Sequence, residues 1–135
     1  MSTPRPGLIL FAHGSRDARW AAPFEAVAAR IRERRPGVPL QLAFLEQMRP
    51  TLAEAAAALV AAGCRQVDVL PMFLGTGGHL RSDLPPMVEA LRVAHPGVQW
   101  GLQPAIGEHA EVSKAMAVAA LSLLPDDEAA AGDAT

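Results

Sequence analysis

Residues 8–17, LILFAHGSRD, decide the fold because they carry an apolar run directly into a polar turn. Residues 8–12 are unbroken apolar sequence, which is typical of a strand covered by helices on both faces. His13, Gly14 and Ser15 end that run abruptly. We therefore expect a central strand that delivers His13 to one edge of a sheet.

Outward from this stretch, apolar runs alternate with helical patterns along the chain. Three further strands are predicted at residues 38–45, 66–74 and 98–103. The apolar spacing i, i+4, i+7 and i+11 predicts the first and the last helix, with stripes formed by Trp20, Phe24, Val27 and Ile31 and by Val112, Met116, Ala119 and Leu123.

The two middle helices are predicted from the signals at their ends. Thr51 followed by Glu54 matches a capping box, which opens the second helix. The third helix is expected to follow a glycine-rich loop at residues 75–86, with Pro85 and Pro86 in an early turn, where a missing N–H group costs little.

This alternation predicts one α/β domain at residues 1–125. We expect a flavodoxin-like (Rossmann-like) fold with a four-stranded parallel sheet of order 2-1-3-4 and helices on both faces. Residues 126–135, DDEAAAGDAT, are expected to form a flexible C-terminal tail.

The composition narrows the class of protein. The net charge is −2 and the isoelectric point about 6.0, so no basic footprint argues for a nucleic-acid partner. Cys64 is the one cysteine, which excludes an intramolecular disulfide. The N-terminus lacks an apolar signal core and no apolar run reaches membrane-spanning length, so we expect a cytoplasmic protein without a membrane partner.

Candidate chemistry gathers where the predicted strands end. In open parallel sheets, ligands bind beyond the carboxyl ends of the strands, where the strand order reverses. His13 follows the first strand, Glu46 the second, and His79 the third through a glycine-rich loop. Imidazole and carboxylate groups are suitable ligands for divalent transition metals, and they also accept protons near neutral pH. Each residue alone also fits a plainer role, as a turn, cap or solvent-facing residue.

Arginines accompany this edge of the predicted sheet. Eleven of the twelve basic residues are arginine, which is the residue suited to bidentate carboxylate or phosphate contacts. A general compositional bias towards arginine and alanine accounts for the same count. The candidates at or near the edge are Arg16, Arg19, Arg49 and Arg81.

Four stretches in order, LILFAHGSRD, AFLEQMRPTL, VLPMFLGTGGHLRSDLP and GVQWGLQPAIGEHAEV, together resemble the small, single-domain sirohydrochlorin chelatases. The resemblance runs from about Leu8 to Leu124. It implies class II chelation, in which Co²⁺ or Fe²⁺ enters sirohydrochlorin without ATP during cobalamin or sirohaem synthesis. The family also has nickel-inserting members. The metal is then a substrate, and no prosthetic cofactor is expected.

The resemblance also implies the roles of particular residues. His13 and His79 match the active-site histidines of the family, and Glu46 matches the acidic residue that joins them at the metal in some members. We expect these three to be the metal-binding and catalytic residues. Further residues are expected to bind the tetrapyrrole, either by contacting its carboxylates or by letting the macrocycle approach the backbone. They are Ser15, Arg16, Arg49, Gly77, Gly78 and Arg81.

A single-domain member resembles half of the larger tandem relatives, which implies a homodimer that binds the small-molecule tetrapyrrole in its cleft. Two other functions stay open at this point, as does a chelatase-fold domain without activity whose histidines cap turns. One is a non-catalytic carrier of metal or tetrapyrrole. The other is a histidine-dependent phosphatase, although Ala12 stands where such an enzyme needs an arginine to hold phosphate.

Overall fold

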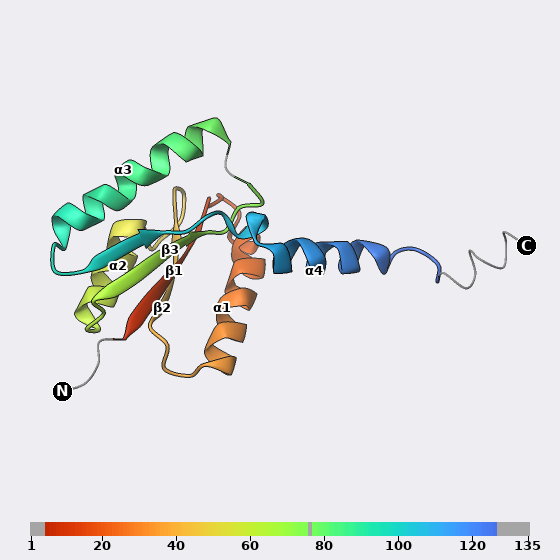
Figure 1. Ribbon diagram of the computed structural model, residues 1–135, viewed down its shortest axis with the longest axis horizontal. Coiled ribbons are helices and arrows are strands. Elements are labelled where there is room, and N and C mark those ends of the chain that lie inside the picture. Colours follow the sequence, from red (N-terminus) through yellow and green to blue (C-terminus); the bar gives the residue numbers. More distant parts are fainter. Residues whose placement is uncertain (1–4, 76, 127–135) are drawn as a thin grey trace, which may run out of the picture.

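The computed structural model describes residues 5–75 and 77–126, without the side chain of His79 (Figure 1). The strands are β1 (Pro6–Ala12), β2 (Leu40–Phe44), β3 (Gln66–Pro71) and β4 (Gln99–Leu102). The helices are α1 (Ala22–Arg34), α2 (Leu52–Ala61), α3 (Gly78–Ala94) and α4 (Ala110–Leu121), with short 3-10 turns η1 (Ala18–Ala21) and η2 (Ile106–Glu108).

The four strands form one parallel sheet of order β2-β1-β3-β4, which confirms the predicted topology. Phe11 of β1 pairs with Ala43 of β2 on one side and with Pro71 of β3 on the other. This register aligns the carboxyl ends of the three strands. The residues that follow them therefore lie at one edge of the sheet.

Helices cover both faces of the sheet, as expected (Figure 1). On one face, α2 and α3 cover Ile9 and Phe11 of the central strand, and both of these side chains are fully buried. On the other face, α1 packs against β1 and β2, with Ala28 of the helix against Leu10 and Leu40. None of the helices within residues 5–75 and 77–126 has the length and apolarity needed to cross a bilayer.

Cys64 lies at the amino end of the sheet. Its side chain is buried, and burial raises the pKa of its thiol above the ordinary value. A Cβ atom on Gly7 would lie only 2.9 Å from the Cys64 sulfur, so glycine lets the strand pass close to this thiol.

Several predicted boundaries and the predicted stripe of the first helix are corrected by the structure. The strands β2, β3 and β4 are shorter than predicted, although backbone hydrogen bonds continue past their carboxyl ends, as from Leu45 N–H to the Ala12 carbonyl. The stripe of the first helix is shifted: Ala28 is buried and Val27 is 37% exposed. Trp20 lies in η1, before α1 begins.

The glycine-rich loop is shorter than predicted, because α3 begins at Gly78. Pro85 and Pro86 consequently lie inside the helix rather than in an early turn. In a regular helix the N–H groups that these prolines lack would bond the carbonyl oxygens of Arg81 and Ser82. Both residues are exposed, so water can take the place of the missing donors.

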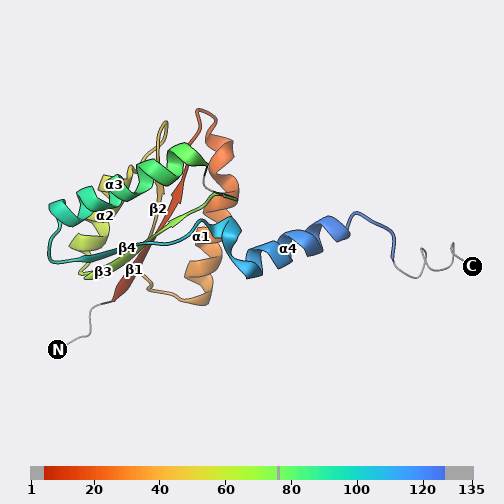
Figure 2. The same ribbon diagram turned by 45° about the horizontal axis from the view of Figure 1, so that its top comes forward.

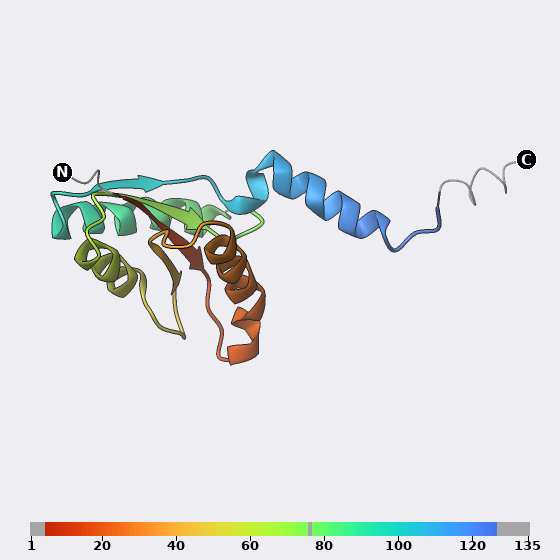
Figure 3. The same ribbon diagram turned by 90° about the horizontal axis from the view of Figure 1, so that it is seen from below.

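The last helix does not cover the sheet. No residue of α4 is buried, and Figures 1, 2 and 3 all show the helix running away from the other elements. The predicted stripe of Val112, Met116, Ala119 and Leu123 therefore packs against no strand, and Leu123 lies beyond the end of the helix. Apart from Asp126, the predicted C-terminal tail lies outside the described residues.

Candidate functional site

His13 and Glu46 are brought together by the pairing of β1 with β2. Past the ends of these strands, Leu45 N–H donates to the Ala12 carbonyl at 2.9 Å and Glu46 N–H donates to the His13 carbonyl at 3.1 Å. The backbone ladder thus extends to the two candidate residues. Their side chains meet, with His13 Nε2 3.2 Å from Glu46 Oε1.

The His13–Glu46 pair faces solvent. The two side chains are 48% and 55% exposed. The imidazole and the ring of Phe73 are arranged edge to face, with ring centroids 6.4 Å apart. Phe73 and Leu45 are half-buried and pack against the main core, which gives the pair an apolar support beside its open side. The arrangement suits an incoming ion that must reach both ligands from solution.

Gly14 is the residue that permits this pairing. Its φ of +100° lies in the region that disfavours L side chains. A Cβ atom built there would lie 1.8 Å from the Glu46 carbonyl oxygen, which is far inside van der Waals contact. The chain after His13 can therefore pass over the backbone of Glu46 only with glycine at this position.

Glu46 lies in a tight loop between β2 and α2. Met48 N–H donates to the Glu46 carbonyl at 2.8 Å, and Gln47 has a positive φ of 68°. Phe44 N–H donates to the Pro50 carbonyl at 2.9 Å, which returns the loop to the end of β2. Backbone hydrogen bonds therefore fix the position from which the Glu46 side chain extends.

The predicted capping box is present at the start of α2 and also binds Arg49. The Thr51 hydroxyl accepts from Glu54 N–H at 3.2 Å, and Glu54 Oε1 accepts from Thr51 N–H at 2.9 Å. The Arg49 guanidinium forms a bidentate pair with the same carboxylate. These contacts, with Arg49 first and the Thr51 backbone second, lower the pKa of Glu54 to about 2. The pair raises the pKa of Arg49.

A second local network orders the turn after His13. Asp17 N–H donates to the Ser15 hydroxyl at 3.1 Å, so Ser15 stabilises the turn. The Asp17 carboxylate caps η1 and pairs with Arg19 at 3.1 Å, and this pairing lowers the pKa of Asp17. Asp17 was not among the site residues predicted from the sequence. The sequence signal for this capping aspartate was its place two residues before an arginine at the start of a helix.

His79 is the second residue of α3, whose N-cap is Gly77. The helix follows β3, the strand next to β1, so the backbone of His79 starts from the expected edge of the sheet. Its side chain lies outside the described part of the structure, and its meeting with His13 stays a prediction. Among the side chains that are described, no cluster of three His, Cys, Asp or Glu residues could hold a metal ion.

The glycines of the loop differ from Gly14. A Cβ atom on Gly75, Gly77 or Gly78 would meet no other atom within 4 Å. No described contact in the chain therefore requires glycine at these three positions. Arg16 and Arg81 are exposed near the same edge. Arg81 lines a cavity of about 260 Å³ between the start of α3 and the segment after β4.

Gly107 is a structural residue of this edge whose role the sequence did not reveal. Its N–H donates to the Phe73 carbonyl at 2.9 Å, and a Cβ atom there would lie 2.0 Å from the Leu74 carbonyl oxygen. The segment after β4 is thereby held against the segment after β3. A glycine before a helix gave no sign of this close approach, because the approaching chain is distant in sequence.

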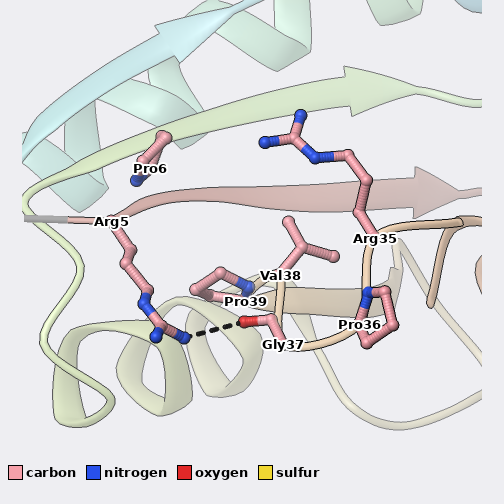
Figure 4. A pocket seen from close by; sticks show the side chains of 7 residues that line it. All are labelled: Arg5, Pro6, Arg35, Pro36, Gly37, Val38 and Pro39. Atoms are coloured by element: carbon pink, nitrogen blue, oxygen red, sulfur yellow. Dashed lines mark hydrogen bonds between the residues drawn. The ribbon is translucent and has the colours of Figure 1, made fainter.

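A cavity of about 300 Å³ at the opposite end of the sheet is not part of the site. Two arginines line this cavity. The Arg5 guanidinium donates to the Gly37 carbonyl at 3.1 Å, whereas Figure 4 shows the Arg35 side chain extending away from Arg5. The two guanidinium groups do not converge on a common anion. The lining residues are Arg5, Pro6, Arg35, Pro36, Gly37, Val38 and Pro39.

Comparisons with known proteins all find similarity to CbiX proteins and related chelatases. A family model described as CbiX matches residues 7–121. A sirohydrochlorin cobaltochelatase from Methanosarcina acetivorans is 29% identical over 83 residues, which are 62% of this chain and 64% of that protein. The chain thus aligns with less than two thirds of this relative's length.

Two solved structures are similar to this chain. One, from Marinobacter aquaeolei VT8, is described as a CbiX protein of cobalamin (vitamin B12) biosynthesis. It aligns with a TM-score of 0.78 and 34% identity over 87% of this chain and 95% of its own. The other is SirB from Bacillus subtilis with Fe³⁺, which aligns with a TM-score of 0.70 and 28% identity over 90% of this chain and 48% of its own.

We predict that Gly14→Ala destabilises the protein by about 1–3 kcal/mol and separates His13 from Glu46, because the new methyl group must displace the Glu46 backbone. Urea denaturation measures the loss of stability. The matched control is Gly75→Ala, which has open space around its Cβ position. Equal stability of the two variants would contradict the assigned role of Gly14.

We predict a pH-dependent contribution of Glu54 to stability. Its pKa is lowered to about 2 from 4.5, so the stabilisation is complete above pH 4.5 and is lost as the pH falls towards 2. The difference in melting temperature between the wild type and Glu54→Gln should stay constant from pH 8 to about pH 5 and shrink below that. A difference that persists unchanged at about pH 2 would refute this assignment.

Proposed function

The chain belongs to the CbiX family, and from that premise we propose that it inserts a divalent metal ion, Co²⁺ or Fe²⁺, into sirohydrochlorin without ATP. The observation that carries the proposal is the exposed pair of His13 Nε2 and Glu46 Oε1, 3.2 Å apart at the carboxyl edge of the sheet. The name of the Methanosarcina relative supports the reaction, and the iron in the SirB structure supports a metal substrate.

In this reaction the metal ion is a substrate that must bind and then leave. Few protein ligands and an open coordination sphere favour such transfer, because a closed set of four ligands would retain the ion. The His13–Glu46 pair meets this requirement, since about half of each side chain faces solvent. We assign His79 as the third ligand, approaching from the start of α3.

The same residues serve as proton acceptors. Insertion releases two protons from the pyrrole nitrogens as the metal exchanges water for four nitrogen ligands. A neutral imidazole and a carboxylate both accept protons near neutral pH. The 3.2 Å separation lets a proton taken up by His13 be stabilised by the Glu46 carboxylate.

The macrocycle is assigned to the surface above the glycine-rich loop. Gly77 and Gly78 leave open space where a Cβ atom would stand, so a flat ligand can approach the backbone. Arg16 and Arg81 are exposed near this edge and suit the carboxylates of the tetrapyrrole. Arg49 would have to exchange its Glu54 partner for a substrate carboxylate. Ser15 supports the turn that carries Arg16.

We further propose that two copies form the cleft and that the reaction takes place in the cytoplasm. The SirB structure supports the first point, because the region similar to this chain is 48% of that protein. Cobalt, iron and nickel accept the same imidazole and carboxylate ligands. Parallel rate measurements with the three ions would identify the preferred metal and hence favour the cobalamin or the sirohaem pathway.

The proposal predicts accelerated metal insertion over many turnovers when catalytic amounts of protein meet sirohydrochlorin and Co²⁺ or Fe²⁺. The visible spectrum of the macrocycle reports the rate. His13→Ala and Glu46→Gln should each lower the rate by roughly 100-fold, as expected for loss of a proton acceptor that also binds the ion. Glu25→Gln, an exposed carboxylate on α1, is the control and should retain the wild-type rate.

One result would refute the proposed activity, and another would refute the assigned site. Stoichiometric binding of metal or tetrapyrrole without turnover would identify a carrier instead. Accelerated insertion that is equal in the wild type, His13→Ala and Glu46→Gln would keep the activity but move the site elsewhere.

A second prediction concerns Gly78. Gly78→Ala should leave the melting temperature unchanged or slightly raised, because the methyl group meets no protein atom and alanine is the better helix former. The KM for sirohydrochlorin should rise by roughly 10-fold, since the methyl group occupies the surface assigned to the macrocycle. A stable variant with unchanged KM would place the macrocycle away from this loop.

A further inference from the structure

Two arginines at the carboxyl edge of the sheet are held by carboxylates in the same way. Arg49 lies in the loop after β2, where its Nε and one terminal nitrogen bind the two carboxylate oxygens of Glu54. Arg19 lies in η1, after the turn that follows β1, and its Nε and one terminal nitrogen bind the two oxygens of Asp17 at 3.2 and 3.1 Å. This fork is the geometry with which arginine recognises a carboxylate on another molecule.

The other ion pairs that arginine or lysine forms within the described residues differ from these forks. Arg92 bonds Glu89 and Lys114 bonds Glu111, in each case through one nitrogen and to a residue three positions away on the same helix. In the described part of the chain, forked arginines therefore occur only in the segments after β1 and β2. These are the segments that carry the candidate metal ligands.

Each of the two carboxylates keeps a hydrogen bond of its own when its arginine leaves. Glu54 Oε1 accepts from Thr51 N–H at 2.9 Å in the capping box. Asp17 Oδ1 accepts from Arg19 N–H at 2.9 Å at the start of η1. The two arginine side chains are 92% and 80% exposed, so each guanidinium can turn from its internal partner to a ligand.

We propose that Arg19 and Arg49 bind two carboxylates of the tetrapyrrole. Asp17 and Glu54 occupy these arginines until the substrate arrives. The inference rests on the proposed function, and it adds Arg19 to the residues assigned to the macrocycle. A tethered carboxylate is present at a high effective concentration, so a small free acid competes poorly with it. A polycarboxylate held at several points can displace both tethered groups, so the two pairs select for the number of carboxylates on the ligand.

The exchange of partners has a cost that can be measured. The arginines lower the pKa values of Asp17 and Glu54, so both acids are ionised at neutral pH. Substrate binding must therefore break two ion pairs and leave two negative charges near the incoming carboxylates. Ion pairs this exposed are weak, so each should reduce the affinity by roughly 3-fold rather than prevent binding.

Binding of metal-free sirohydrochlorin to the full chain, followed by the fluorescence of the macrocycle, tests the inference. Asp17→Asn and Glu54→Gln each remove the competing charge but keep a side chain that can form the same cap. Each should lower the dissociation constant by roughly 3-fold, and the double variant by roughly 10-fold. Arg19→Gln and Arg49→Gln should each raise it by roughly 10-fold, since a charge-assisted contact is lost.

Two further variants separate this role from a general effect of charge. Glu54→Gln in an Arg49→Gln background should leave the dissociation constant unchanged, because no guanidinium remains to be released. Glu89→Gln is the matched control: it releases Arg92 from an exposed pair on α3 and should bind sirohydrochlorin as the wild type does. Melting temperatures at pH 7 verify that each variant is folded.

Three results would overturn the inference: unchanged affinity in Asp17→Asn and Glu54→Gln, a gain from Glu54→Gln that persists in the Arg49→Gln background, or wild-type affinity in Arg19→Gln and Arg49→Gln. Each of them leaves the proposed chelation standing if the wild type inserts metal. A wild type that binds sirohydrochlorin with the expected pattern but inserts no metal would refute chelation alone. A wild type that binds no sirohydrochlorin would refute both.

Discussion

The placement of β1 between β2 and β3 is the constraint on which the rest of the structure depends. Its residues Ile9 and Phe11 have no exposed surface, and both of its edges are hydrogen-bonded in parallel. A parallel neighbour on each side aligns the carboxyl ends, so the residue after β1 lies between two loops. His13 therefore owes its position to a buried strand and does not need a dedicated support.

Polar contacts then refine a geometry that the sheet has already set. The backbone bond from Glu46 to the His13 carbonyl continues the ladder by one step, and Gly14 makes room for it. The Arg49–Glu54 pair fastens the far side of the Glu46 loop to the start of α2. The proposed metal site thus stands on backbone hydrogen bonds, while its side chains stay free to exchange ligands.

The topology could be predicted from the sequence because it follows from the order of apolar runs and from capping signals such as Thr51 and Glu54. The pairing of His13 with Glu46 followed from that topology. The start of α3 could not be predicted from the sequence. Pro85 and Pro86 suggested the beginning of a helix, and their exposed surroundings are visible only in three dimensions. The same holds for Gly14 and Gly107, whose neighbours are remote in sequence. The apolar stripe of α4 predicted a buried face, but no residue of this helix is buried, because the helix runs away from the sheet.

The position of Cys64 bears on how quickly a bound ion could be released. A thiolate is a strong, soft ligand that would hold cobalt, iron or nickel far longer than an imidazole and a carboxylate do. The one sulfhydryl of this chain is buried at the opposite end of the sheet, and burial raises its pKa. The carboxyl edge is thereby left with ligands whose bonds to these ions break readily. The metal ligands proposed at the carboxyl edge are therefore an imidazole and a carboxylate, without competition from a thiolate.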